Sequence, residues 1–244
     1  MAPGPEPRPS ILSLTRDELT RHCLDRGQSA YRAKQLWNWL YARHVADWDS
    51  MKNLPAAFRA ELARDFVLDA AEPLEVQGAP ADTRKILVGL RDGERVEAVI
   101  IPAGARNTVC VSTQVGCRFH CAFCASGQAG FIRNLEAAEI AGQVLLATRL
   151  LGQRPTNVVY MGVGEPLDNY DETLKSVRTI NDGDGLAIGA RKITISTSGL
   201  IPGIERLAGE KLQVELSVSL HAAFSDLRSR LMPINRQHPL PDLI

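Results

Sequence analysis

A repeated strand-loop-helix rhythm constrains the fold of this chain more than any other feature of its 244 residues. Four strand-like apolar segments are each followed by a loop and then by an amphipathic helical pattern. The strands are "NTVCVSTQ", "NVVYMGVGEP", "KITISTSG" and "QVELSVSLH", and the helices are expected near residues 135–151, 171–182, 202–209 and 225–231. This alternation predicts an α/β fold with a parallel sheet and right-handed crossovers, curved or closed as a barrel.

The four units are too few to close the usual eight-unit barrel. The chain stops at "QHPLPDLI", where a further amphipathic helix begins. We therefore expect a partial barrel that is truncated at its C-terminus. In sheets of this class the functional site lies at the carboxyl ends of the strands, and the notable polar residues of this chain fall there.

The sequence before the barrel divides into a tail, a helical domain and a hairpin. Residues 1–10 are proline-rich and are expected to be disordered. Residues 11–70 carry helical patterns and predict a small accessory domain, whose basic and aromatic side chains suit either RNA contacts or a compact core. Residues 71–105 hold two apolar strands around "RDGE", which predicts a linker and a β-hairpin. The barrel core then occupies residues 106–244.

The charge balance gives no global sign of a nucleic-acid ligand. Lys plus Arg and Asp plus Glu number 28 each, although a local basic patch remains compatible with this balance. The chain has no apolar run long enough to span a bilayer, and its first residues lack the pattern of a secretory signal. We therefore expect a cytoplasmic protein without a membrane partner.

The cysteines are concentrated in one stretch, "TVCVSTQVGCRFHCAFCASG", which contains four of the five. Cys117, Cys121 and Cys124 form a C-x3-C-x2-C array, and thiolates at this spacing can converge on a soft metal centre. Structural zinc nearly always has four protein ligands, and His120 is placed to point away from a centre shared by its neighbour Cys121. A 4Fe-4S cluster held by three cysteines leaves one iron open. A zinc knuckle remains the alternative.

The cysteine loop resembles the signature of the radical S-adenosylmethionine (SAM) superfamily. This resemblance implies a (β/α)6-type barrel, a 4Fe-4S cluster on Cys117, Cys121 and Cys124, and SAM chelated to the open iron. "MGVGEP" resembles the segment in which a glycine and a glutamate, here Gly164 and Glu165, take the methionine amino group. At the next two strand ends the resemblance implies further SAM contacts from Ser196, Ser219, Leu220 and His221. Taken singly, such residues are more often turn glycines or satisfied polar groups.

A narrower resemblance covers nearly the whole chain. The segments "YRAKQLWNWLY", "LPAAFR", "VEAVIIP", "CVSTQVGC", "GEPLDN", "STSG", "SVSLHA" and "MPIN" occur in the order typical of the RlmN family. Members methylate C2 of an adenine in 23S rRNA and in tRNA, and the closely similar Cfr-type enzymes methylate C8. The resemblance implies RNA binding by the helical domain, an external electron donor such as flavodoxin, and a monomeric protein.

Cys110 stands apart from the other three cysteines of the loop. It is seven positions before Cys117, about 20 Å away if the strand stays extended, which makes it a poor ligand for the same centre. Strand alternation places Cys110 with Ser112 and Gln114 on one face, and a small buried thiol is the plain interpretation. The resemblance instead implies that Cys110 is catalytic, taking the C2 proton of a covalent RNA adduct and then forming a disulfide. It likewise implies that Glu97 in "RVEAVIIP" is a proton acceptor.

The sequence departs from the family at one important point. The resemblance implies a second cysteine, near the C-terminus, that carries the methyl group, and this chain has no cysteine after Cys124. We therefore expect methyl transfer from the intact protein and not from these 244 residues alone. An inactive fragment with a structural metal site remains one alternative. Another radical SAM enzyme, such as a glycyl-radical activase, remains a second, although it leaves the helical domain and Cys110 unexplained.

Overall fold

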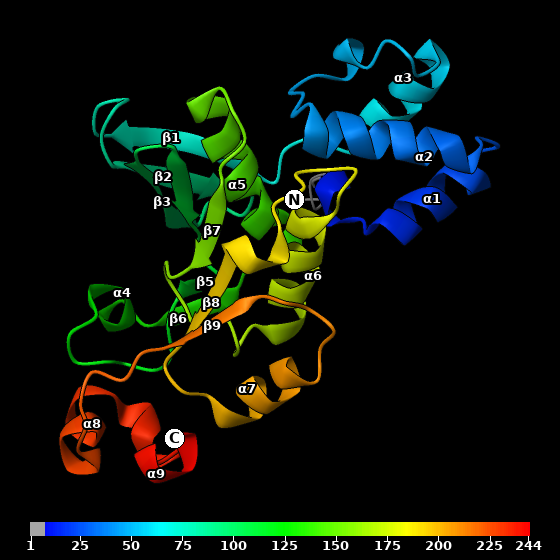
Figure 1. Cartoon of the computed structure of the whole chain (residues 1–244). Helices are drawn as coiled ribbons and strands as arrows, with labels where there is room; N and C mark the ends of the chain where they lie inside the picture. Colours follow the sequence, from blue (N-terminus) through cyan, green and yellow to red (C-terminus); the bar gives the residue numbers. More distant parts are fainter. Residues whose placement is uncertain (1–7) are drawn as a thin grey trace, which may run out of the picture.

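The computed structural model describes residues 8–244, and its N-terminal part is a group of helices beside the sheet (Figure 1). These helices are η1 (Ile11–Ser13), α1 (Arg16–Asp25), α2 (Ala30–Trp37), the π-helical turn η2 (Asn38–Ala42), η3 (Trp48–Ser50) and α3 (Ala56–Asp65). Helix α1 begins at a capping box, in which Thr15 accepts from the Glu18 amide and the Glu18 carboxylate accepts from Thr15. Most of the predicted tail, residues 1–7, lies outside the described residues.

The helical group is joined to the barrel by polar contacts. Arg16 forms an ion pair with Asp182, at 3.0 Å, and the Lys175 ammonium donates to the Ser13 carbonyl at 2.8 Å.

Trp37 is 2% exposed and packs on Tyr41, with 4.4 Å between the ring centroids. Trp37 is therefore a core residue, one of the two outcomes that the sequence left open for the aromatic side chains.

The strands form one continuous sheet of seven, in the order β1-β2-β3-β4-β7-β8-β9. Pairing is antiparallel from β1 to β4 and parallel from β4 to β9. The bounds are β1 (Ala71–Gln77), β2 (Arg84–Leu90), β3 (Arg95–Ala103), β4 (Arg106–Cys110), β7 (Asn157–Tyr160), β8 (Ile193–Thr197) and β9 (Glu215–Val218). The expected α/β fold with parallel strands is confirmed. The sequence did not reveal that the hairpin β2–β3 would extend the same sheet through β4.

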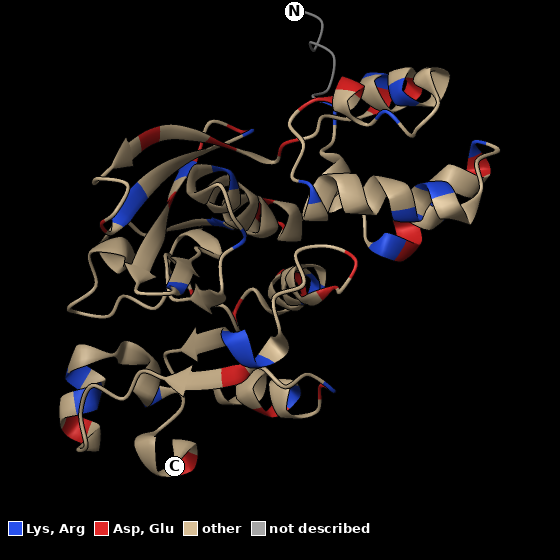
Figure 2. Ribbon diagram, turned by 45° about the horizontal axis from the view of Figure 1, so that its top comes forward, with Lys and Arg blue, Asp and Glu red and all other residues tan. Residues whose placement is uncertain are grey.

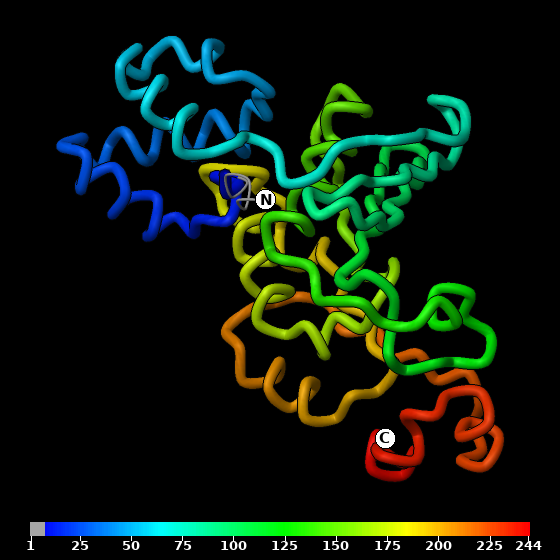
Figure 3. The backbone as a smooth tube through the Cα atoms, turned by 180° about the vertical axis from the view of Figure 1, so that it is seen from behind, coloured from blue at the N-terminus to red at the C-terminus, as the bar shows by residue number. Residues whose placement is uncertain are grey.

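The connections carry the predicted helices and one small hairpin. Strands β5 (Gln114–Gly116) and β6 (Phe131–Asn134) pair with each other and flank the short helix α4 (Ala125–Gln128). The remaining elements are α5 (Ala137–Leu151), α6 (Tyr170–Asn181), η4 (Ala190–Lys192), α7 (Ile201–Ala208), α8 (Ser225–Leu231), η5 (Pro233–Arg236) and α9 (Leu240–Leu243). Seen from behind, α8 and α9 lie at the same end of the molecule as the loop around α4 (Figure 3).

The two faces of the parallel strands have different surroundings. Val109, Val158 and Ile193 lie on one face and are completely buried in the hydrophobic core. The opposite face carries Cys110, which pairs with Val159, and continues through Thr194 to the exposed Glu215. Because side chains of paired residues share a face, this register places a more polar surface on the side away from the core.

Charges of both signs are interspersed over the helical group, the sheet and the C-terminal helices (Figure 2). None of the helices in the described part of the chain is long and apolar enough to cross a membrane. The balance of charge in the sequence therefore reflects a mixed surface rather than two separated patches of opposite sign.

Candidate functional site

A cavity of about 300 Å³ lies at the carboxyl ends of β7, β8 and β9. It collects side chains from the cysteine loop and from three successive strand ends. Its lining includes eight of the eleven residues singled out in the sequence: Cys117, Cys121, Cys124, Gly164, Glu165, Ser196, Ser219 and His221. The other three, Glu97, Cys110 and Leu220, do not line it. The structure thus brings the thiols and the glutamate of the "GEP" segment to one place.

The cysteine loop is shaped by the β5–β6 hairpin that encloses it. The Cys117 amide donates to the Gly130 carbonyl at 2.7 Å, which closes the base of the loop. Gly116, immediately before, has φ of 75°, and a Cβ atom there would lie 1.9 Å from the Gly130 oxygen. Only glycine fits this close approach. The "VGC" in the sequence is therefore a structural requirement for presenting the first thiol.

The thiols of the loop influence one another electrostatically. Burial raises the pKa of the Cys117 thiol, and it raises that of Cys121 to about 11. The three cysteines line one cavity, and negative charge on a neighbouring cysteine adds to both shifts. The Cys117 and Cys121 thiols are therefore neutral at pH 7 without a metal, and binding of a metal would release their protons.

The arrangement of the donor atoms distinguishes a single metal ion from a cluster. Within residues 8–244, no three His, Cys, Asp or Glu side chains converge on one position that could hold an ion. A zinc site needs its thiolates about 2.3 Å from one point, whereas a cluster presents separate irons to separate cysteines. His120 turns away, with φ of 48° and its Nδ1 3.2 Å from the Gly127 carbonyl oxygen. Three thiols that line one cavity without converging on a single point fit a cluster better than a zinc ion.

Glu165 is the acidic group of the cavity. Its side chain is 3% exposed, and one carboxylate oxygen accepts both the amide and the hydroxyl of Ser198, at 2.7 and 2.8 Å. The other oxygen accepts the Leu167 amide at 3.1 Å. Burial nevertheless raises the pKa of Glu165, because these hydrogen bonds only partly replace water. A cationic ligand would compensate the buried carboxylate.

Gln114 fixes the backbone that presents Glu165. Its side-chain oxygen accepts the Glu165 amide at 2.9 Å, and its amide group donates to Asp168 at 2.7 Å. Gly164 has φ of 105°, and a Cβ there would lie 2.6 Å from the Gln114 Cβ. Gln114 had been assigned only to a polar strand face. Its role depends on the packing of two loops about 50 positions apart in the sequence, which no local pattern reveals.

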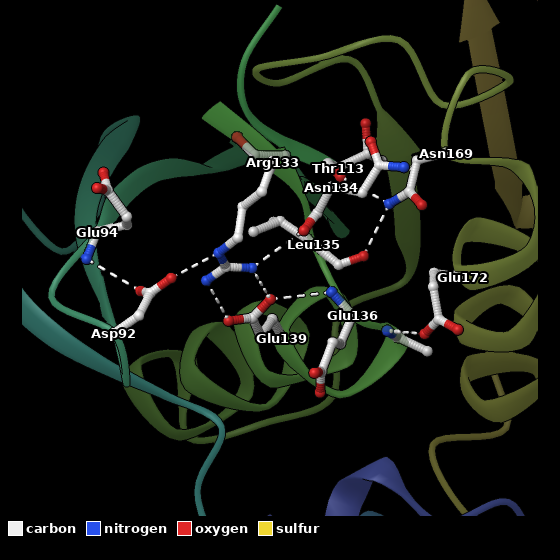
Figure 4. Close-up of polar contacts among 12 residues, drawn as sticks. Asp92, Glu94, Thr113, Arg133, Asn134, Leu135, Glu136, Glu139, Asn169 and Glu172 are labelled. Atoms are coloured by element: carbon white, nitrogen blue, oxygen red, sulfur yellow. Dashed lines mark hydrogen bonds and ion pairs between the residues drawn. The ribbon is translucent and has the colours of Figure 1, made fainter. Parts of the chain in front are cut away.

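Asn169, the last residue of "GEPLDN", connects the loop after β7 to the two ends of the cysteine hairpin (Figure 4). Its side-chain amide donates to the carbonyls of Thr113 and Leu135, at 2.8 Å each. The return strand of the cysteine hairpin is held further by Arg133, which bonds Asp92 in the β2–β3 turn and Glu139 of α5 (Figure 4). The cysteine hairpin is therefore anchored on both sides.

The residues at the ends of β8 and β9 form the remaining wall. His221 has φ of 56°, and its ring packs on Phe123 with 4.2 Å between centroids. This contact joins the cysteine loop to the end of β9. The Leu220 side chain is 42% exposed and does not line the cavity. Ser196 lines it together with Ser198, the partner of Glu165 that the sequence reading missed although both stand on one face of "STSG".

Cys110 lies behind the cavity wall. Cys110 ends β4, which pairs with β7, and Met161, which follows β7, lines the cavity. Burial raises the pKa of Cys110. Glu97 stands on the same face of the sheet, since Cys110 pairs with Val99, and its carboxylate forms an ion pair with Lys85 at 2.9 Å. The two residues therefore share a surface that adjoins the cavity.

The disulfide implied by the resemblance is not supported. All five cysteines are free, and no disulfide joins any of the described residues. The physical reason is that Cys110 has no partner: Cys23 is buried in α1, the other three cysteines line a cavity that Cys110 does not line, and the sequence has no cysteine after Cys124.

Family models and curated relatives indicate the same family for both the N-terminal and the C-terminal part of the chain. A sequence model described as the ribosomal RNA large subunit methyltransferase N-terminal domain matches residues 10–68, and the radical SAM superfamily model matches residues 111–244. Curated proteins named "Probable dual-specificity RNA methyltransferase RlmN" are similar: that of Geobacillus thermodenitrificans is 45% identical over 98% of this chain and 66% of its own length. The Akkermansia muciniphila protein is 43% identical over 98% and 68%, respectively.

A solved structure shows the same fold. The crystal structure of a radical SAM methyltransferase from Sphaerobacter thermophilus superposes with a TM-score of 0.92 at 44% identity. The match covers 96% of this chain and 70% of the other. The chain thus spans about two thirds of the length of its curated relatives.

Proposed function

This chain belongs to the RlmN family of radical SAM proteins, and from that membership we propose that the whole protein methylates C2 of an adenine in 23S rRNA and in tRNA. The observation that carries the proposal is the cavity in which three thiols and a buried carboxylate meet at the carboxyl ends of the parallel strands. For these 244 residues we propose binding of the cluster and of SAM.

Each wall of the cavity has a proposed part in cofactor binding. Cys117, Cys121 and Cys124 hold a 4Fe-4S cluster, which supplies an electron to SAM for radical formation when both are bound. The Glu165 carboxylate and the backbone at Gly164 receive the methionine ammonium, because an ammonium is the natural partner of a buried carboxylate. The ribose and adenine of SAM are proposed to contact Ser196, Ser219, Leu220 and His221. Of these four residues, only Leu220 does not line the cavity.

Cys110 and Glu97 are proposed to handle protons next to this cavity. A buried, neutral thiol is a weak base, so Cys110 must lose its proton before it can accept one from the adenine. Glu97 lies on the same sheet face and is the proposed acceptor in that region. The Glu97 carboxylate forms an ion pair with Lys85. We further propose a cytoplasmic location and an external one-electron donor such as a flavodoxin.

Mass spectrometry of RNA tests the substrate. In a strain that lacks the gene for this protein, we expect 2-methyladenine to disappear from 23S rRNA and from the tRNA that carries it. The intact gene should restore the modification, and the same gene with Cys110→Ala should not, because the proposed proton acceptor is removed. An unchanged amount of 2-methyladenine in the deletion strain, or loss of 8-methyladenine instead, would refute the proposed C2 product.

A further inference from the structure

Arg228 is a completely buried cation that the proposed function does not use. It lies on α8 with an exposed fraction of 0%. Its guanidinium donates to four oxygen atoms: Ser198 O at 2.6 Å, Ser219 O at 3.3 Å, Leu220 O at 3.2 Å and Asn235 Oδ1 at 2.8 Å. All four of these acceptors belong to uncharged groups, three backbone carbonyls and one side-chain amide.

A buried guanidinium without a carboxylate is costly, because the cation loses its water. The carbonyl oxygens of Ser198, Ser219 and Leu220 compensate part of this loss. They come from the segments that follow β8 and β9, so one planar group fixes two strand ends relative to each other. Lysine could not replace it, because its donors radiate from one nitrogen rather than from a wide planar fork.

The contact to Ser198 connects Arg228 to the acidic group of the cavity. Ser198 accepts from Arg228 with its carbonyl and donates its amide and hydroxyl to Glu165. The backbone here has little room to shift: a Cβ on Gly199 would lie 3.0 Å from the Arg228 Nη2. Displacing the guanidinium would therefore move the donors that orient the Glu165 carboxylate.

Helix α8 is itself held against the cysteine loop, beside which it lies in Figures 1 and 3. The Ala122 amide donates to the Leu231 carbonyl at 2.8 Å. On the other side of Arg228, the Asn235 amide group donates to Ser225 and Ser229, which fixes the acceptor for the guanidinium. The Arg228 guanidinium therefore belongs to a helix that contacts the cysteine loop and, through Arg228 itself, the segments after β8 and β9.

We propose that Arg228 is a positioning residue for SAM: through Ser198 it holds the Glu165 carboxylate in place to receive the ligand's ammonium, and it holds the Ser219 segment opposite. This inference rests on the proposed function, because it concerns the same cavity. It adds a residue on a helix outside the barrel strands, which acts without touching the ligand.

The test uses the full 244-residue chain with Arg228→Met, Arg228→Lys and, as a matched control, Arg230→Met. Arg230 lies on the same helix and is exposed. In the cofactor-free chain, hydrogen exchange of the Ser198 amide should be faster in Arg228→Met than in the parent and unchanged in Arg230→Met. After anaerobic reconstitution, SAM affinity by calorimetry should fall roughly tenfold in Arg228→Met, the size of effect that loss of one charge-assisted hydrogen bond produces.

Three comparisons separate the possible outcomes. Iron and sulfide content should equal that of the parent, which shows that the cluster site is intact. Arg228→Lys should remain defective; full recovery by lysine would assign the effect to charge alone and overturn the positioning role. In a Glu165→Gln background, Arg228→Lys should reduce SAM affinity less than it does in the parent, because only the contact to the Ser219 segment remains to be lost. Parental SAM affinity in Arg228→Met would also overturn the inference, whereas a parent chain that binds no iron or SAM would refute the proposed function itself.

Discussion

Replacing Cys117, Cys121 and Cys124 together by alanine is expected to reduce iron and sulfide in the reconstituted chain from about four each to background. The expected loss is complete because these are the only thiols that line the cavity among the described residues. Iron and acid-labile sulfide analysis, with visible absorption, measures the result. SAM binding should be lost with the cluster, since the open iron provides its anchoring position.

The matched controls are the two cysteines outside the cavity. Cys23→Ala changes a buried thiol of α1, and Cys110→Ala changes one behind the cavity wall. Both variants should retain the parental iron and sulfide content. If the triple variant kept its iron, or if Cys110→Ala lost it, the assignment of the three loop cysteines as the ligands would be wrong.

The second large effect is expected from Glu165→Gln. Loss of the carboxylate removes the charged partner of the methionine ammonium, and a buried charge-assisted hydrogen bond contributes about 1.5–3 kcal/mol. SAM affinity should therefore fall roughly 10- to 100-fold. Calorimetry on the reconstituted chain measures it, with Glu205→Gln, an exposed glutamate of α7, as the control that should bind normally.

The same variant should alter the pH dependence of stability in the cofactor-free chain. The folded-state pKa of Glu165 is raised above its ordinary value of 4.5, so the folded chain binds this proton more tightly than the unfolded chain does. Stability from this group is therefore present below pH 4.5 and is lost as the pH rises through the folded-state pKa. Relative to Glu165→Gln, the parent's free energy of unfolding should fall as pH rises from 4.5. A difference that does not change with pH would contradict the buried carboxylate.

The barrel portion of the fold was predictable because its signals are local. Apolar strands followed by amphipathic helices define α5, α6, α7 and α8 within a few residues of their observed bounds. The hairpin around "RDGE" was also visible, since Asp-Gly favours tight turns. The pairing of this hairpin with β4 joins the predicted hairpin and the predicted barrel into one sheet. That pairing depends on contacts between segments that no short sequence pattern describes.

Only part of the candidate site was predictable from the sequence, because the other part depends on contacts between distant segments. The thiols, Gly164 and Glu165 stand in recognisable patterns, and all of them line the cavity. Gln114, Ser198 and Arg228 act instead by holding other residues, and their partners are distant in sequence. A buried arginine in "SDLRSRL" looks like one charge on an amphipathic helix until its acceptors are known. Supporting residues of this kind emerge only from packing.

The most direct test of the central claim is electron paramagnetic resonance of the reduced, anaerobically reconstituted chain with and without SAM. The account predicts an iron-sulfur signal whose shape changes when SAM is added, because the ligand occupies the iron that no cysteine binds. Stoichiometric zinc with no iron-sulfur signal, or a signal that SAM leaves unchanged, would contradict it.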